Sequence, residues 1–196
     1  MRRRGISVVI FAAAISGHLA CAEDASLDPL TAREDTLGWE AVGRLDIGDG
    51  GFCTGVLIET DLVLTAAHCV FYERAGFAQR YAGEIVFRAG LRQGEAVAEE
   101  RVAAYVVHPA YVPQKTPAAD TVSVDLALLR LDRAIPAAVA APFEVSGLRA
   151  GAREVAVVSF ASTRAAAPSI QRRCNVLGRQ PGLLMFTCDV DYGSSG

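Results

Sequence analysis

The apolar segments of this chain are short, and turn-forming residues separate them at regular intervals. Strand-length runs bounded by Gly, Pro, Asn and Asp are typical of β-structure. None of the stretches between them sustains the 3.6-residue period of an amphipathic helix over three turns, so the pattern predicts an all-β sandwich or pair of barrels. The expected strands are Ala41–Leu45, Phe52–Ile58, Leu62–Thr65, Glu84–Arg88, Val102–Val107, Leu126–Leu131, Val155–Phe160, Gln171–Leu177 and Leu183–Cys188. The Pro- and Ala-rich stretch Ile135–Pro142 is the best candidate for a linker between two halves.

The N-terminus has the pattern of an export signal. Arg2, Arg3 and Arg4 precede an apolar run from Ile6 to Ile15, which is too short for a comfortable membrane span. Ala20-Cys21-Ala22 resembles a cleavage site, so residues 1–22 are expected to be a secretory signal peptide and the protein to be extracellular or periplasmic. The alternatives are a buried first helix and a lipoprotein anchored through Cys21. Residues 23–37 are polar and acidic without periodicity, which favours a flexible leader or short propeptide.

Charge excludes some partners. The 196 residues carry 19 basic and 22 acidic side chains, a formal net charge of -3. This balance gives no electrostatic reason to expect nucleic acid or an anionic membrane as partner, unless the protein is lipidated at Cys21. The length suits one globular unit or two small subdomains that share a cleft.

Removal of Cys21 with the signal leaves Cys53, Cys69, Cys174 and Cys188. Four cysteines in an oxidising compartment predict two disulfides, for which three pairings exist. We favour Cys53–Cys69 and Cys174–Cys188, because each closes a hairpin-sized loop within one half. No C-x-x-C pair is present in the sequence, so a zinc site is not expected and no metal is assigned.

Three residues could carry out acyl transfer. Such chemistry needs a serine hydroxyl, an imidazole base, a carboxylate that orients the imidazole, and N–H groups for the oxyanion. His68 follows the apolar run Leu62–Thr65, Asp125 opens another, and Ser195 lies in Gly193-Ser194-Ser195-Gly196. Competing residues fit less well. His108 lies in a His-Pro turn, Asp120 in a Thr/Pro-rich loop, and Ser194 lacks the glycine spacing of Ser195.

These segments together resemble the trypsin-like, or chymotrypsin-superfamily, serine proteases. Thr65-Ala66-Ala67-His68-Cys69 is similar to their histidine motif, Asp125-Leu126-Ala127-Leu128-Leu129 to their aspartate motif, and Gly193-x-Ser195-Gly196 to their nucleophile loop. Phe52-Cys53-Thr54-Gly55 matches the strand whose cysteine bridges to the one after the histidine. Within the superfamily, the secreted bacterial branch that includes glutamyl endopeptidases looks most similar.

The resemblance implies two antiparallel Greek-key β-barrels with the active site in the cleft between them. It assigns residues 38–196 to the protease domain, His68, Asp125 and Ser195 to the catalytic triad, and the amides of Gly193 and Ser195 to the oxyanion hole. It implies polypeptide substrates and no cofactor, and we expect a monomer. A non-catalytic binding or adhesion module on the same fold is the alternative.

Ser194 departs from the family pattern, and Asp189 leaves the substrate specificity undecided. Ser194 stands where trypsins keep an aspartate that binds the new N-terminus, so activation through that ion pair is not expected. Asp189 is a candidate for the base of the S1 pocket, but it also fits a structural segment, so P1 specificity stays undecided. Because only Gly196 follows Ser195, we expect a second barrel that is incomplete and residues 1–196 alone to lack protease activity.

Overall fold

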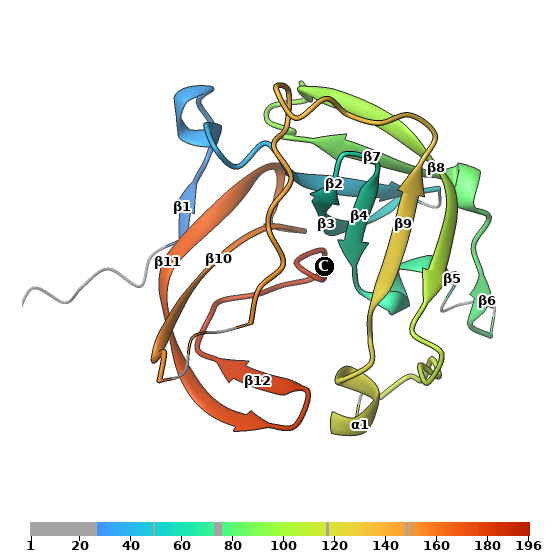
Figure 1. The fold of residues 1–196 in the computed structure, drawn as a ribbon, viewed down its shortest axis with the longest axis vertical. Coiled ribbons are helices and arrows are strands. Elements are labelled where there is room, and N and C mark those ends of the chain that lie inside the picture. Colours follow the sequence, from blue (N-terminus) through green and yellow to red (C-terminus); the bar gives the residue numbers. More distant parts are fainter. Residues whose placement is uncertain (1–26, 49, 73–75, 117, 148, 150) are drawn as a thin grey trace, which may run out of the picture.

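The computed structural model describes residues 27–196 except 49, 73–75, 117, 148 and 150, so the expected signal peptide at residues 1–22 lies outside the described residues. The described chain is an all-β protein of two parts (Figure 1). A closed barrel contains most of the first half, and an open sheet contains most of the second. The predicted all-β class is confirmed.

The barrel consists of β-strands that pair in the closed order β2-β3-β4-β9-β8-β7. Side chains alternate between inside and outside along these strands, as in Ile85, Phe87 and Ala89 of β7, which are fully buried. The interior is therefore filled by apolar residues from every strand. The barrel strands are β2 Val42–Ile47, β3 Gly51–Glu59, β4 Leu62–Thr65, β7 Ile85–Ala89, β8 Ala98–Val107 and β9 Ala127–Leu131.

The second half forms a four-stranded antiparallel sheet in which β1 and β10 flank β11, and β12 also pairs with β11. Within the described residues this sheet does not close, in agreement with the prediction of an incomplete second barrel. Its strands are β1 Leu27–Pro29, β10 Glu154–Ala161, β11 Arg164–Gln180 and β12 Leu183–Phe186.

Short elements complete the described chain. Strands β5 and β6 form a small hairpin, and the helical turns are single or short. They are β5 Phe71–Tyr72, β6 Ala78–Gln79, η1 Glu34–Thr36, η2 Ala67–Val70, η4 Ala82–Glu84 and α1 Ala119–Val122. No helix among the described residues is long and apolar enough to cross a membrane.

The segment expected to be a flexible leader is ordered where the structure describes it. Leu27–Pro29 pairs with β11, and Leu30 and Thr36 are buried. This part of the segment forms a strand without a periodic sequence, because pairing with a long neighbouring strand uses backbone groups and needs no side-chain periodicity. Whether the segment is removed as a propeptide stays a prediction.

The stretch Ile135–Pro142 does connect the barrel to the sheet, but it packs on the barrel. Ile135 and Ala140 are buried, and the N–H groups of Ile135 and Phe143 donate to the carbonyls of Thr60 and Leu57. The connection is therefore fixed to the first half along its length.

Candidate active site

The pairing of two barrel strands brings His68 and Asp125 together. Thr65 at the end of β4 lies opposite Ala127 at the start of the antiparallel strand β9. Residues that follow Thr65 and residues that precede Ala127 therefore emerge at the same end of the barrel. The turn η2 carries His68 there, and Asp125 lies in the opposing connection.

Both carboxylate oxygens of Asp125 contact His68. Oδ2 lies 2.7 Å from the ring Nδ1, and Oδ1 accepts a hydrogen bond of 2.9 Å from the main-chain N–H of His68. Such a two-point contact fixes the ring relative to the acid. With Nδ1 donating to the carboxylate, Nε2 is left to accept a proton.

The environment of the pair suits these roles. Burial raises the pKa of the Asp125 carboxyl, but the hydrogen bonds from the His68 ring and main chain outweigh this effect, and the pKa is lower than its usual value. The side chain of His68 is 47% exposed and that of Asp125 is 20% exposed. The base can therefore meet a substrate while the acid is largely covered.

Residues 191–196 form a tight loop that ends between the barrel strands and the β10–β11 sheet (Figure 1). The N–H of Ser194 donates to the carbonyl of Asp191 over 3.0 Å. Gly193 has φ of 93°, and a Cβ there would lie 2.3 Å from the ring of Phe52. Both the backbone conformation and the lack of space require glycine at this position.

The backbone of this loop leaves the two predicted oxyanion donors available. Among the described residues, the N–H groups of Gly193 and Ser195 have no hydrogen-bond acceptor. The Tyr192 carbonyl accepts a 2.6 Å hydrogen bond from the N–H of Ser162, so the trans peptide directs the Gly193 N–H away from Ser162. An external oxygen could bind there, as the predicted role requires.

Ser195 is hydrogen-bonded to strand β3, which the Cys53–Cys69 disulfide links to the residue after His68. Its carbonyl accepts a 2.8 Å hydrogen bond from the N–H of Thr54 in β3. Within the described chain, its hydroxyl donates no hydrogen bond to His68. Catalytic hydrogen bonds are often long in the absence of substrate and tighten in the complex.

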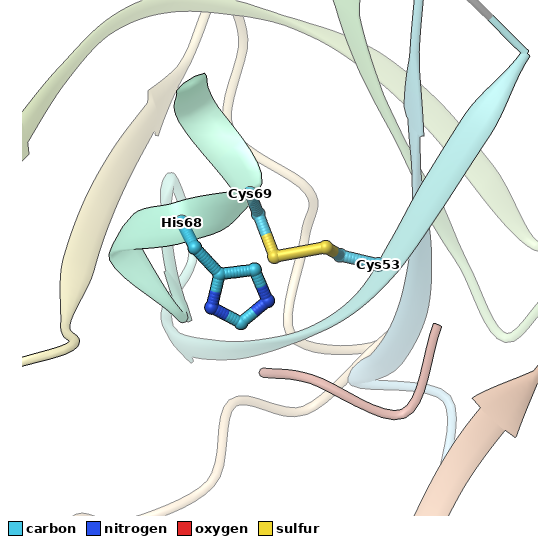
Figure 2. A group of neighbouring side chains, drawn as sticks. All are labelled: Cys53, His68 and Cys69. Atoms are coloured by element: carbon cyan, nitrogen blue, oxygen red, sulfur yellow. A yellow bond between two sulfur atoms is a disulfide. The ribbon is translucent and has the colours of Figure 1, made fainter. Parts of the chain in front are cut away.

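A disulfide connects the two sides of this arrangement. The predicted Cys53–Cys69 bond is present, with Cys53 preceding Thr54 and Cys69 following His68. Figure 2 shows the bond beside the imidazole, and the ligand atoms of Cys53, His68 and Cys69 lie within 4.8 Å of one another. Because both sulfurs are bonded to each other, they are not thiolates and do not form a zinc-type ligand set.

The second predicted disulfide, Cys174–Cys188, is also present and joins β11 to the segment before the nucleophile loop. Asp189 follows it. The side chain of Asp189 is exposed, and its N–H donates a 2.7 Å hydrogen bond to Oε1 of Gln171. The backbone of this segment is thus tied to the sheet, while Asp189 itself is exposed.

Ser194 makes hydrogen bonds at the position where trypsins have an aspartate in an ion pair. Its hydroxyl donates to the carbonyl of Phe160 over 2.9 Å and accepts from the N–H of Asp191 over 3.2 Å. The Asp191 carboxylate in turn accepts from the hydroxyls of Ser162 and Thr163. These contacts hold the loop to the β10–β11 turn without a buried charge.

Two contributors to the site were not found by sequence reasoning. Thr54 attracted attention only as a neighbour of Cys53, and its contacts with the loop depend on tertiary structure. Tyr111 was not singled out; it follows the turn of His108, whose Nδ1 accepts a hydrogen bond from the N–H of Ala110. Burial and the nearby charge of Asp125 raise the pKa of Tyr111 to about 12. The sequence signal that could have found it is an aromatic residue two positions after the His108-Pro109 turn.

The fold defines a class of protein, the two-barrel proteins of the trypsin type. The family description Trypsin matches residues 32–177, and the chain belongs to that family. It is 36% identical over 93 residues to Serine protease 56 of Mus musculus, a match that spans 47% of this chain and 14% of that protein. The chain therefore covers only a small part of that relative's length.

Solved structures show the same fold at low sequence identity. A Glu endopeptidase in complex with MPD superposes with a TM-score of 0.70 and 19% identity over 86% of this chain and 78% of the other. The scabies mite inactivated protease paralogue S-D1 gives a TM-score of 0.62 and 13% identity over 81% and 75%. These likenesses confirm the predicted trypsin-like fold.

Proposed function

We propose that this protein is a secreted serine endopeptidase that hydrolyses peptide bonds through an acyl-enzyme intermediate. Ser195 attacks the scissile carbonyl, His68 takes its proton and returns it to the leaving amine, and Asp125 holds the imidazole. The N–H groups of Gly193 and Ser195 stabilise the oxyanion. Water then attacks the acyl-enzyme while His68 takes a proton from it, and His68 returns that proton to the Ser195 oxygen as the ester bond breaks and the acid leaves.

The two-point contact between Asp125 and His68 carries this proposal. A carboxylate bound to Nδ1 at 2.7 Å and to the main-chain N–H at 2.9 Å is a specific geometry for orienting a base. A purely structural histidine would not need an accessible ring with a covered acid behind it. The open N–H groups of Gly193 and Ser195 add the second requirement of acyl transfer.

Export is part of the proposal. The signal-like residues 1–22 and the two disulfides fit an oxidising compartment outside the cytoplasm. The substrates would be polypeptides. The Asp189 carboxylate is exposed, and a preference for basic side chains would follow if it lines the S1 pocket. For residues 1–196 alone we expect little turnover, because the sheet that supports the loop is open.

The test is covalent labelling of the protein, isolated as its host makes it, with a fluorophosphonate probe. The expected result is one label on Ser195, absent in Ser195→Ala and in heat-denatured protein. Ser146→Ala removes an exposed serine from the loop before β10 and should leave labelling unchanged. Labelling that persists in Ser195→Ala would remove Ser195 from its role.

The second candidate is a non-catalytic binding module. One solved structure of similar fold is an inactivated protease paralogue, so this architecture also exists without activity. Here the Ser195 hydroxyl lacks a hydrogen bond to His68 in the described chain. A folded protein that neither reacts with the probe nor cleaves peptides would favour this function.

A further inference from the structure

Among the described residues, Thr54 of β3 makes four hydrogen bonds outside the strand ladder, and three of them lead to the second half of the chain. Its N–H donates to the Ser195 carbonyl over 2.8 Å. Its hydroxyl lies 2.8 Å from the Gly193 carbonyl and 3.0 Å from the Phe160 nitrogen. Its own carbonyl accepts from the hydroxyl of Thr65 over 2.8 Å.

The direction of each hydrogen bond follows from chemistry. A carbonyl can only accept, so the Thr54 hydroxyl donates its single proton to Gly193. An amide N–H can only donate, so the hydroxyl accepts from Phe160. Thr54 is 3% exposed and Phe160 is fully buried, so water cannot replace these contacts without rearrangement, and loss of the hydroxyl would leave buried polar groups unpaired.

The contacts of Thr54 lie on both sides of the Ser194–Ser195 peptide in the nucleophile loop. The carbonyls of Gly193 and Ser195 both bind Thr54, and between them lies the peptide whose N–H is the Ser195 oxyanion donor. Thr54 also follows Cys53, whose disulfide partner Cys69 follows His68. Thr54 thus contacts the nucleophile loop directly, and its neighbour Cys53 is covalently linked to Cys69, the residue after His68.

We propose that Thr54 is a positioning residue whose hydroxyl sets the nucleophile loop of the second half at the correct place relative to the base in the first half. The inference rests on the proposed protease function. Because Thr54 is 3% exposed, we expect its loss to affect placement in the transition state more than substrate binding. A displacement of about 1 Å in a catalytic constellation costs on the order of a hundredfold in rate.

The experiment compares three variants of the protein as its host makes it. Thr54→Val keeps the shape and removes the hydroxyl, whereas Thr54→Ser keeps the hydroxyl. Thr36→Val is the matched control, since Thr36 is 1% exposed and its hydroxyl also donates to a main-chain carbonyl, that of Arg33, away from the loop. Each is measured for ester hydrolysis, inhibition by a peptide boronate, and amide hydrogen exchange of residues 191–196.

In Thr54→Val, kcat should fall by about tenfold to a hundredfold with KM within about threefold. Affinity for the boronate, which mimics the tetrahedral intermediate, should fall by the same factor as kcat/KM. Amides of residues 191–196 should exchange faster. Thr54→Ser should recover most of the loss, and Thr36→Val should keep kcat and loop exchange. If Thr54→Val does not fold, Thr54→Ala removes the hydroxyl and leaves room for a water.

The outcomes separate this inference from the proposed function. An active wild type whose hydroxyl-free variants keep full kcat and slow loop exchange would overturn the role of Thr54. A wild type that neither hydrolyses the ester nor binds the boronate would contradict the protease function. In that case exchange alone decides, and the role of Thr54 stands only if residues 191–196 exchange faster in Thr54→Val than in Thr36→Val.

Discussion

The barrel and the sheet place their shares of the site by different means. The barrel contains its own apolar core, with fully buried side chains such as Phe87, Leu57 and Leu129. In the described sheet, the large buried apolar side chains are Phe160 and Ile170, and Ser159, Ser169 and Gln171 are buried beside them. Phe160 packs against Val42 and Leu91 of the first half. The barrel is therefore stabilised from within, and the sheet also depends on its contact with the barrel.

The difference has a functional consequence. His68 and Asp125 both emerge from paired barrel strands, so a stable barrel alone is enough to set their geometry. The loop with Ser195 is attached to β10 through Ser194 and to β3 through Thr54. Its position therefore depends on how the two halves meet.

The largest effect is expected from a change confined to the barrel. In Asp125→Asn, the amide would favour the wrong imidazole tautomer, and kcat should fall by about 10⁴-fold. Asp120→Asn is the matched control, since Asp120 lies on α1 and, among the described residues, its side chain accepts hydrogen bonds from its neighbour Thr121 alone. Steady-state hydrolysis of a peptide ester measures both. An Asp125→Asn variant with the activity of Asp120→Asn would show that another group orients His68.

Core truncations should separate the two regions by stability. Leu129→Ala removes a fully buried side chain from the closed barrel, and Ile170→Ala removes one that is 2% exposed from the open sheet. We expect losses in the free energy of unfolding of about 4 kcal/mol and about 2 kcal/mol, because the tightly packed barrel can collapse less around a cavity. Denaturant unfolding measures both, and a larger loss for Ile170→Ala would contradict the comparison.

The disulfides offer a third comparison. They span 16 and 14 residues, so the chain-entropy model assigns about 3 kcal/mol to each. We expect removal of Cys53 and Cys69 by alanine to lower the global unfolding temperature. Removal of Cys174 and Cys188 should instead increase hydrogen exchange mainly in β11 and β12. Equal global destabilisation by the two double variants would mean that the halves unfold as one unit.

The smallest effect concerns acid pH. The pKa of Asp125 is lower in the folded protein than its usual value, so the folded state binds the proton less readily than the unfolded chain. The stabilisation is complete above the unfolded pKa of about 4 and is lost as the pH falls through the folded pKa. The wild type should therefore lose unfolding temperature more steeply than Asp125→Asn below about pH 4. Parallel curves would refute the shift.

Much of the fold followed from local pattern. Leu62–Thr65 was predicted with its observed bounds, and every other predicted strand overlaps an observed one. Two features were missed for one reason. Strand β11 extends over Arg164–Gln180, well beyond the predicted Gln171–Leu177, and β1 pairs with it although its three residues show no strand pattern. Strand β11 pairs with β1, β10 and β12, and these pairings add backbone hydrogen bonds that cannot be predicted from side-chain periodicity.

The sequence by itself determined most of the strands, a preferred pairing of the cysteines, and which histidine, aspartate and serine lie beside turns or strand ends where a site can form. These are local properties, set by side-chain period, turn residues and short loops. Tertiary structure decided how those residues meet. The contact of Asp125 with His68 requires the register of β4 with β9. The position of Ser195 requires a hydrogen bond from the Phe160 N–H to the Thr54 hydroxyl, between residues more than 100 positions apart in the sequence. Such contacts depend on the packing of two halves, which no local pattern encodes.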